Sequence, residues 1–222
     1  LFRSMLKSMN YEETRLYPDP EIKVLTEELA DFYGVKKEQV FVGVGSDDVL
    51  AMAFMTFFNS DKPILFPDIT YAFYDVWAEL YRIPYKTCPL KEDWNIDPKD
   101  YLQENGGVVI ANPNAPTGLE ASQEVIEEII RSNRDSVVIV DEAYVDFGGT
   151  STIPLIEKYD NLLVVQTFSK SRSMAGLRIG FAIGNEKLIK YLSDAKFSFN
   201  SYTLNHPAQI LGVEALRDKK YF

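Results

Sequence analysis

The stretch Ser136-Val-Val-Ile-Val-Asp-Glu142 indicates the fold class of this chain. A run of β-branched residues ends abruptly in two carboxylates. Such a continuous apolar run is typical of a strand buried on both faces, as in a parallel sheet. A second run, Leu162 to Thr167, has the same character and leads into Phe168-Ser-Lys170. The two runs together predict the centre of an α/β domain.

Outward from these runs, short apolar segments alternate with segments of helical periodicity. Strands are predicted at Gln39 to Val44, Pro63 to Phe66, Gly107 to Ala111 and Gly180 to Ile183, and helices at 22–32, Val49 to Phe58, Tyr71 to Arg82, 123–132 and Glu186 to Ala195. Strands separated by helices favour parallel pairing. We therefore expect a doubly wound, three-layer α/β/α domain, in which a mostly parallel sheet carries helices on both faces.

Polar residues follow the carboxyl ends of several predicted strands. They are Ser46-Asp47, Asn112 to Gly118, Asp141 to Tyr144 and Ser169-Lys170. Because parallel strands end at a common edge, and ligands bind there in open α/β sheets, we expect these residues to meet in one site.

Lys170 is the first candidate for chemistry at that edge. Between Ser169 and Ser171, a lone lysine is most simply a solvated surface group. Arg178 follows eight residues later, flanked by glycines, and a guanidinium offers a phosphate two parallel donors. A lysine amine near a fixed cation and a bound phosphate suits Schiff-base chemistry.

Other residues at the same edge could hold a planar, anionic cofactor. Asp141 is costly at the mouth of a buried strand unless it is paired, so it either caps the next segment or pairs with a protonated pyridine nitrogen. Tyr144 could bond a phenolic ring oxygen and Tyr71 could stack on the ring, or both could be core tyrosines. Ser46, Asp47 and the following helix amides could bind an anion or simply cap the helix.

Composition excludes several classes. The net charge of -10, from 23 basic and 33 acidic residues, argues against a nucleic-acid surface. The single cysteine, Cys88, permits no disulfide within the chain, so we expect a reducing, cytoplasmic location. No apolar run is long enough to span a bilayer. One cysteine and one histidine, His206, cannot build a zinc site. His206 lies at an apparent helix start, where it is expected to act as a cap or loop residue.

The ends suggest a division of the chain. Position 1 is not Met and Lys219-Lys-Tyr-Phe222 follows a helix without a closing signal, so we expect both ends to be cut. Residues 1–20 are expected to lead into the large domain, 21–205 to form it, and 206–222 to begin the helix toward a small C-terminal domain.

Taken together, six stretches resemble fold-type I pyridoxal 5′-phosphate (PLP) enzymes of the class I/II aminotransferase family. They are Tyr17-Pro-Asp-Pro20, Gly45-Ser-Asp47, Thr70-Tyr71, Asn112-Pro-Asn-Ala-Pro-Thr-Gly118, Asp141-Glu-Ala-Tyr144, and Thr167-Phe-Ser-Lys170 through Gly176-Leu-Arg-Ile-Gly180. The resemblance implies that Lys170 holds PLP as a Schiff base and moves a proton between the cofactor and the substrate α-carbon. It also implies that Asp141 pairs with the pyridine nitrogen, Tyr144 bonds the ring oxygen and Tyr71 stacks on the ring.

The same resemblance implies how the phosphate is held. The Ser46-Asp47 turn, Ser169 and Arg178 would bind it. Tyr17 of one subunit would reach the cofactor phosphate of the other, so a homodimer is implied.

Two departures from the family pattern affect these assignments. The family usually has Asn immediately before Pro-Thr-Gly, contacting the ring oxygen, and here that residue is Ala115. Either Asn114 takes this role through a shifted loop, or Tyr144 bears it alone. The family's small domain, which supplies an arginine for the substrate carboxylate, has no counterpart in this sequence.

Within the family, Tyr17-Pro-Asp-Pro20, Val140 to Phe147 and Lys196 to Tyr202 are similar to the histidinol-phosphate aminotransferase subfamily. This implies ping-pong transfer of an amino group from histidinol phosphate to 2-oxoglutarate, in histidine biosynthesis. The alternatives are another class I/II aminotransferase, a phosphothreonine decarboxylase, a non-catalytic PLP-binding regulatory domain, or a folded but inactive piece. The residues that would separate them lie mostly outside this sequence.

Overall fold

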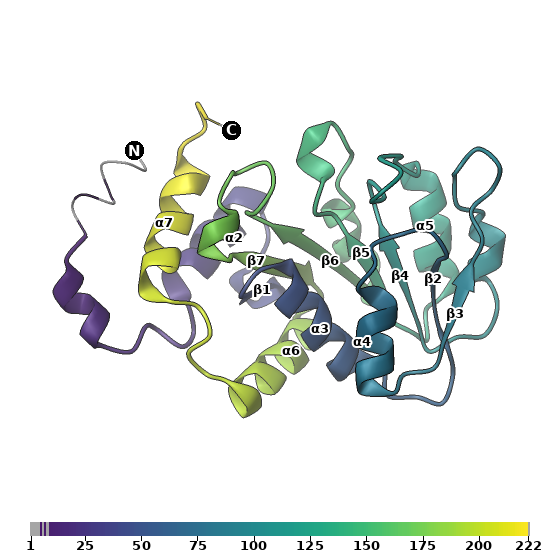
Figure 1. The fold of residues 1–222 in the computed structure, drawn as a ribbon, viewed down its shortest axis with the longest axis horizontal. Helices are drawn as coiled ribbons and strands as arrows, with labels where there is room; N and C mark the ends of the chain where they lie inside the picture. Colours follow the sequence, from purple (N-terminus) through teal and green to yellow (C-terminus); the bar gives the residue numbers. More distant parts are fainter. Residues whose placement is uncertain (1–4, 6, 8, 222) are drawn as a thin grey trace.

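A computed structural model describes Met5, Lys7 and residues 9–221. Its centre is a seven-stranded sheet with the order β1-β7-β6-β5-β4-β2-β3 (Figure 1). The strands are β1 (Val40–Gly43), β2 (Ile64–Pro67), β3 (Tyr85–Cys88), β4 (Gly107–Ala111), β5 (Val138–Asp141), β6 (Leu162–Thr167) and β7 (Gly180–Gly184). The predicted α/β class is confirmed.

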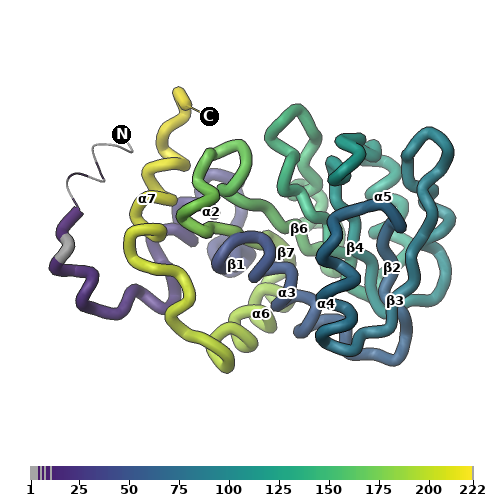
Figure 2. The backbone as a smooth tube through the Cα atoms, in the orientation of Figure 1, coloured from purple at the N-terminus to yellow at the C-terminus, as the bar shows by residue number. Residues whose placement is uncertain are grey.

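The sheet is mostly parallel, as expected, with one reversed strand. Strands β2 to β6 pair in parallel, whereas β7 runs antiparallel to both β6 and β1. The connection from β6 to β7, residues 168–179, contains only a single 3-10 turn, and a parallel crossover needs a longer return path. Since β7 is reversed against both neighbours, β1 points the same way as the remaining strands. Figure 2 shows β1 beside β7, although they are far apart in the sequence.

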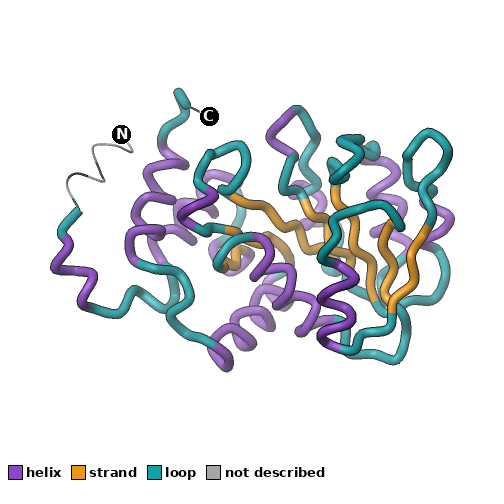
Figure 3. The backbone as a smooth tube through the Cα atoms, viewed as in Figure 1, coloured by secondary structure: helices purple, strands orange, loops and turns teal. Residues whose placement is uncertain are grey.

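Helices cover both faces of the sheet (Figure 3). They are α2 (Lys23–Tyr33), α3 (Ser46–Phe57), α4 (Tyr74–Tyr81), α5 (Gln123–Ser132), α6 (Glu186–Phe199) and α7 (His206–Arg217). Val138 and Val140 belong to a core that residues of α2, α5 and α7 also line, while Ile139 between them belongs to a second core, lined by α3, α4 and α6. Alternate residues of one apolar strand therefore serve two cores, and the predicted three-layer architecture is confirmed.

Some predicted boundaries were wrong for local reasons. Helix α3 begins at Ser46 rather than Val49, because Gly45 adopts φ 86° and turns the chain directly into the helix. Helix α4 begins at Tyr74 rather than Tyr71. Strand β3 was not predicted. It is an edge strand whose first three residues are exposed, so its sequence lacks an apolar run.

The last helix belongs to the same packed body. Val213 and Leu216 of α7 are buried in the core that α2 also lines. His206 is the first residue of α7, and its Nε2 lies 2.9 Å from Glu13 Oε2. The predicted helix start is confirmed, but the expected cap or loop role of His206 is wrong, because Asn205 is the N-cap and its side chain accepts from the Ala208 N–H. None of the helices in the described part of the chain is long and apolar enough to cross a membrane.

Candidate active site

The carboxyl ends of the parallel strands surround a cavity of about 180 Å³. The predicted site residues that line it are Ser46, Asp47, Tyr71, Asp141, Tyr144, Ser169, Lys170 and Arg178. Asp141 is the last residue of β5, and the others come from the segments that follow β1, β2, β5 and β6. The topology thus brings together, at one edge, residues that are up to 132 positions apart, as Ser46 and Arg178 show (178 − 46).

Two cations border the cavity. The Lys170 amine lies 5.0 Å from the centre of the Tyr144 ring, within the range of a cation–π contact. The Arg178 guanidinium lies 3.7 Å from Asp47 Oδ2. Arg178 itself has φ 55°, in the left-handed region that non-glycine residues rarely adopt. Such local strain persists where the surrounding structure holds it, and it clusters at functional sites.

The floor beneath Arg178 is built from glycine backbone. A Cβ on Gly45 would lie 2.4 Å from Arg178 Nη2, and a Cβ on Gly180 would lie 2.2 Å from the Gly45 carbonyl carbon. A side chain at Gly180 would have to displace the Gly45–Ser46 backbone, whereas one at Gly45 would displace the Arg178 guanidinium and would also need the left-handed φ of 86°. Helix α3 starts at this point, so its first backbone N–H groups and its dipole favour an anion there.

Asp141 also lines the cavity and is 5 % exposed. Tyr74 Oη donates to its Oδ2 at 2.8 Å, and the Ala143 backbone N–H donates to its Oδ1 at 3.2 Å. Burial raises the pKa of Asp141 to about 6, against the opposing effect of these two hydrogen bonds. No cation among the described residues forms an ion pair with it. A buried carboxylate of this kind is suited to a cationic ligand atom.

Tyr71 supplies a ring on the cavity wall. Its hydroxyl donates to Asp47 Oδ1 at 3.0 Å, and its ring meets the Tyr74 ring edge to face, with centroids 5.7 Å apart. Burial, followed by the Asp47 carboxylate, raises the pKa of Tyr71 to about 12, so its hydroxyl stays protonated. The hydroxyl is anchored, while the ring is placed to cover a planar group.

Asn114 does not line this cavity, whereas Ala115 does. The Asn114 side chain is buried in its own loop, where its amide donates to Ile69 O and Thr117 Oγ1 and its oxygen accepts from Thr70. The structure therefore gives no support to a ligand contact by Asn114. Its hydrogen bonds hold the loop next to the segment that carries Tyr71.

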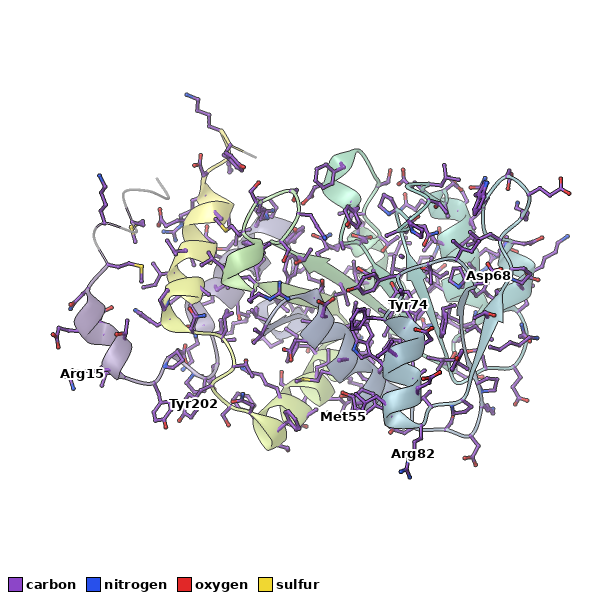
Figure 4. All side chains as sticks on the ribbon, viewed as in Figure 1. Arg15, Met55, Asp68, Tyr74, Arg82 and Tyr202 are labelled. Carbon is purple, nitrogen blue, oxygen red and sulfur yellow. The ribbon has the colours of Figure 1, made fainter. Side chains whose placement is uncertain are left out.

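Tyr17 also lies away from this cavity. It is 81 % exposed and stacks on Tyr202, with ring centroids 4.6 Å apart. Tyr202 is labelled in Figure 4. The chain itself leaves Tyr17 accessible, as a role in another subunit's site would require.

The sequence does not identify Tyr74 as a residue of the site, although its hydroxyl hydrogen-bonds to Asp141. It is the last residue of Thr70-Tyr-Ala-Phe-Tyr74, and its spacing suggests only a core aromatic. Its position relative to Asp141, 67 residues later, depends on the packing of α4 against the sheet.

Two larger hollows exist in the described part of the chain. One of about 390 Å³ lies between residues 172–177 and α7, and one of about 670 Å³ lies beside β1 between α2 and α6. Neither is lined by a buried carboxylate. The combination of an amine, a buried acid and a helix N-terminus distinguishes the smaller cavity as the candidate site.

Comparison with known families identifies the class of protein that this fold and site define. The model of the aminotransferase class I and II family matches residues 5–222. The chain therefore belongs to that family.

Individual relatives are more specific. The chain is 51% identical over 220 residues to histidinol-phosphate aminotransferase of Lactococcus lactis subsp. cremoris, and 54% identical over 222 residues to histidinol-phosphate aminotransferase 1 of Hydrogenovibrio crunogenus. These alignments cover 99% and 100% of this chain, and 62% of each relative. The chain thus spans somewhat less than two thirds of the length of these curated relatives.

Solved structures share the fold. The histidinol-phosphate aminotransferase of Clostridium acetobutylicum aligns with a TM-score of 0.89 at 23% identity, covering 99% of this chain and 66% of that one. The Sinorhizobium meliloti enzyme, solved in complex with pyridoxal-5′-phosphate, aligns with a TM-score of 0.86 at 21% identity, covering 99% and 60%. These likenesses establish the fold alone.

Proposed function

We propose that this chain is the PLP-binding part of an aminotransferase that acts on histidinol phosphate and 2-oxoglutarate. The observation that carries the proposal is the meeting of Lys170, Asp141 and Arg178 around one cavity. Membership of the aminotransferase family supports the reaction class and the cofactor. The histidinol-phosphate aminotransferases at about half identity over nearly the whole chain support the substrate pair.

The residues that line the cavity offer a partner for each polar group of PLP. Arg178, the N-terminus of α3 and the Ser169 hydroxyl would hold the phosphate, at the point where the Arg178 guanidinium lies directly against Gly45. Asp141 would hold the protonated ring nitrogen. Tyr144 would bond the ring oxygen without help from Asn114. When bound, PLP supplies a ring that accepts electrons from the substrate α-carbon.

The chain's own groups would handle the proton. The Lys170 amine, beside the Tyr144 ring, would bind the cofactor covalently and then carry the proton to and from the α-carbon. Tyr71 would cover the ring face and limit access of water. Asp47 contacts Arg178 at 3.7 Å, so a bound phosphate competes with this carboxylate for the guanidinium.

Partner, place and domain division are part of the proposal. The subunits would form a homodimer in the cytoplasm, with Tyr17 of each subunit at the phosphate of the other. Residues 21–205 would act as the large domain, 1–20 as its lead-in, and 206–222 as the helix toward a small domain. The exposure of Tyr17 supports the dimer, and the share of the relatives that this chain covers supports the division.

The cofactor is tested first on the chain itself. Protein mixed with PLP should absorb in the visible range, and borohydride should fix the cofactor on Lys170, as peptide mass would show. Lys170→Ala should trap none, while Lys190→Ala, an exposed lysine paired with Asp194 on α6, should trap as much as the unaltered chain. Covalent trapping by Lys170→Ala would refute the assignment.

The substrate is tested on a version that spans the length of the relatives. Single half-reactions with histidinol phosphate, aromatic amino acids and phosphothreonine are followed by loss of the cofactor's visible band. Histidinol phosphate should react fastest. Faster conversion of aromatic amino acids would show that histidinol phosphate is not the preferred substrate. Release of carbon dioxide from phosphothreonine would indicate a decarboxylase instead.

A further inference from the structure

Tyr74 makes a direct contact with Asp141, a residue that lines the candidate active site. It is the first residue of α4 (Figure 4), and its side chain is fully buried. Its hydroxyl donates to Asp141 Oδ2 at 2.8 Å. Tyr74 does not line the cavity, so it can act on a ligand there only through Asp141.

The two donors to Asp141 restrain its carboxylate. The Ala143 N–H binds one oxygen and the Tyr74 hydroxyl binds the other. Donors on both oxygens fix the rotation of the carboxylate plane, and each oxygen keeps a lone pair for another partner. The backbone donor is present whatever the side chains are, so Tyr74 is the side chain that sets this orientation.

The hydroxyl also acts on the charge of Asp141. Burial and the Asp47 carboxylate disfavour the ionised form, while the Tyr74 hydroxyl, the Ala143 N–H and the Lys170 amine favour it. These groups come from α4, α3 and the segments after β5 and β6. Hydrogen bonds to a charged group are among the stronger ones in proteins. Loss of the bond from Tyr74 would therefore favour the protonated form of Asp141 over the ionised form.

Packing holds the Tyr74 ring independently of its hydroxyl. The ring contacts Phe66 and Tyr71 edge to face, at centroid distances of 5.9 and 5.7 Å, and stacks on Phe54 at 6.2 Å. A phenylalanine would fill the same space, so apolar packing alone does not require a tyrosine. The hydroxyl is needed only for Asp141.

We propose that Tyr74 is a positioning residue that keeps the Asp141 carboxylate ionised and oriented toward the ring nitrogen of the cofactor. The inference rests on the proposed function for the identity of the ligand. It adds a residue that touches both the acid and Tyr71, and so links the partner of the ring nitrogen to the residue that covers the ring.

The test begins without cofactor. Tyr74→Phe is compared with Tyr101→Phe, the other large tyrosine that is fully buried, whose hydroxyl faces Cys88 instead of the cavity. Carbon-13 labelled aspartate reports the titration of Asp141, with Asp141→Asn to assign its signal. Tyr74→Phe should raise the midpoint by about one pH unit or more, and Tyr101→Phe should leave it unchanged. An unchanged midpoint in Tyr74→Phe overturns the inference.

The second measurement adds PLP and follows its dissociation constant against pH. Because protonated Asp141 cannot pair with a cationic ring nitrogen, Tyr74→Phe should bind PLP about five-fold more weakly at pH 6, with the gap closing by pH 8. A loss that is equal at all pH values would indicate a merely structural role and overturn the inference. If the unaltered chain binds no PLP, the proposed function fails, and the cofactor-free titration still decides whether Tyr74 controls Asp141.

Discussion

At the scale of single residues, the burial that suits Asp141 to its proposed role also makes the stability of the fold depend on pH. Its ordinary pKa is near 3.8, and burial raises it to about 6 in the folded chain. The unfolded chain gives up its proton more readily than the folded one between these values. Stability contributed by this group is therefore present below pH 4 and is lost as the pH rises toward 6.

Replacing Asp141 by Asn removes this pH dependence. The stability of Asp141→Asn relative to the unaltered chain should increase by up to about 3 kcal/mol between pH 4 and pH 7. Urea unfolding of the cofactor-free proteins at both pH values measures it. Asp160→Asn, at a side chain that is 77% exposed, should show no such trend. A constant difference for Asp141→Asn would contradict the raised pKa.

Residue patterns predicted most of the candidate site because polar groups that follow buried strands must meet at one edge. Asp141, Lys170 and Arg178 were recognisable on this basis. The direction of a side chain within a loop was not predictable, as Asn114 shows by turning toward Thr70. Nor was Tyr74, since nothing local distinguishes a core tyrosine from one that bonds a buried acid.

At the scale of elements, the proposed anion site depends on the junction of β1, α3 and β7. Gly180, the first residue of β7, packs directly on the Gly45–Ser46 peptide. That contact is backbone against backbone, so no side chain can move aside to relieve a substitution. This close approach fixes the position of the N-terminus of α3 relative to Arg178.

Gly180→Ala should therefore destabilise the chain by about 3 kcal/mol or more and weaken PLP binding. Gly176→Ala, in the same connection, places its Cβ in open space and should change neither. Thermal unfolding and fluorescence titration with PLP measure the two effects. Equal stability of the two variants would show that the turn can move away from β7.

Element boundaries were predictable where apolar periodicity is strong and not where it is weak. Strands β4 and β6 have the bounds that their apolar runs indicate. The edge strand β3 could not be predicted, because three of its four residues face solvent and form no apolar run. The reversed direction of β7 depends on the short connection after Lys170, whose path is determined by tertiary contacts rather than by local preference.

At the scale of the whole molecule, the proposed exchange of Tyr17 between subunits predicts complementation. A mixture of Lys170→Ala and Tyr17→Ala chains would contain mixed dimers in which one site has both an intact lysine and an intact partner tyrosine. The mixture should bind PLP more tightly than either variant alone, as titration with PLP measures. Borohydride treatment after the titration shows how much of the bound PLP is attached to Lys170. A PLP affinity that is only the average of the values for the two variants would contradict a contribution of Tyr17 to the site of the other subunit. Sedimentation of each variant checks that the dimer itself survives.

The pairing of β1 with β7 has a consequence for the order in which the chain is made. On the ribosome, Gly45 and Ser46 emerge long before Gly180, and β1 has β7 as its neighbour in the finished sheet. Arg178 is synthesised just as late. A nascent chain therefore cannot bring Gly45 and Ser46 against Gly180 until translation has passed β7, so cofactor binding at the proposed anion site would have to follow the synthesis of β7.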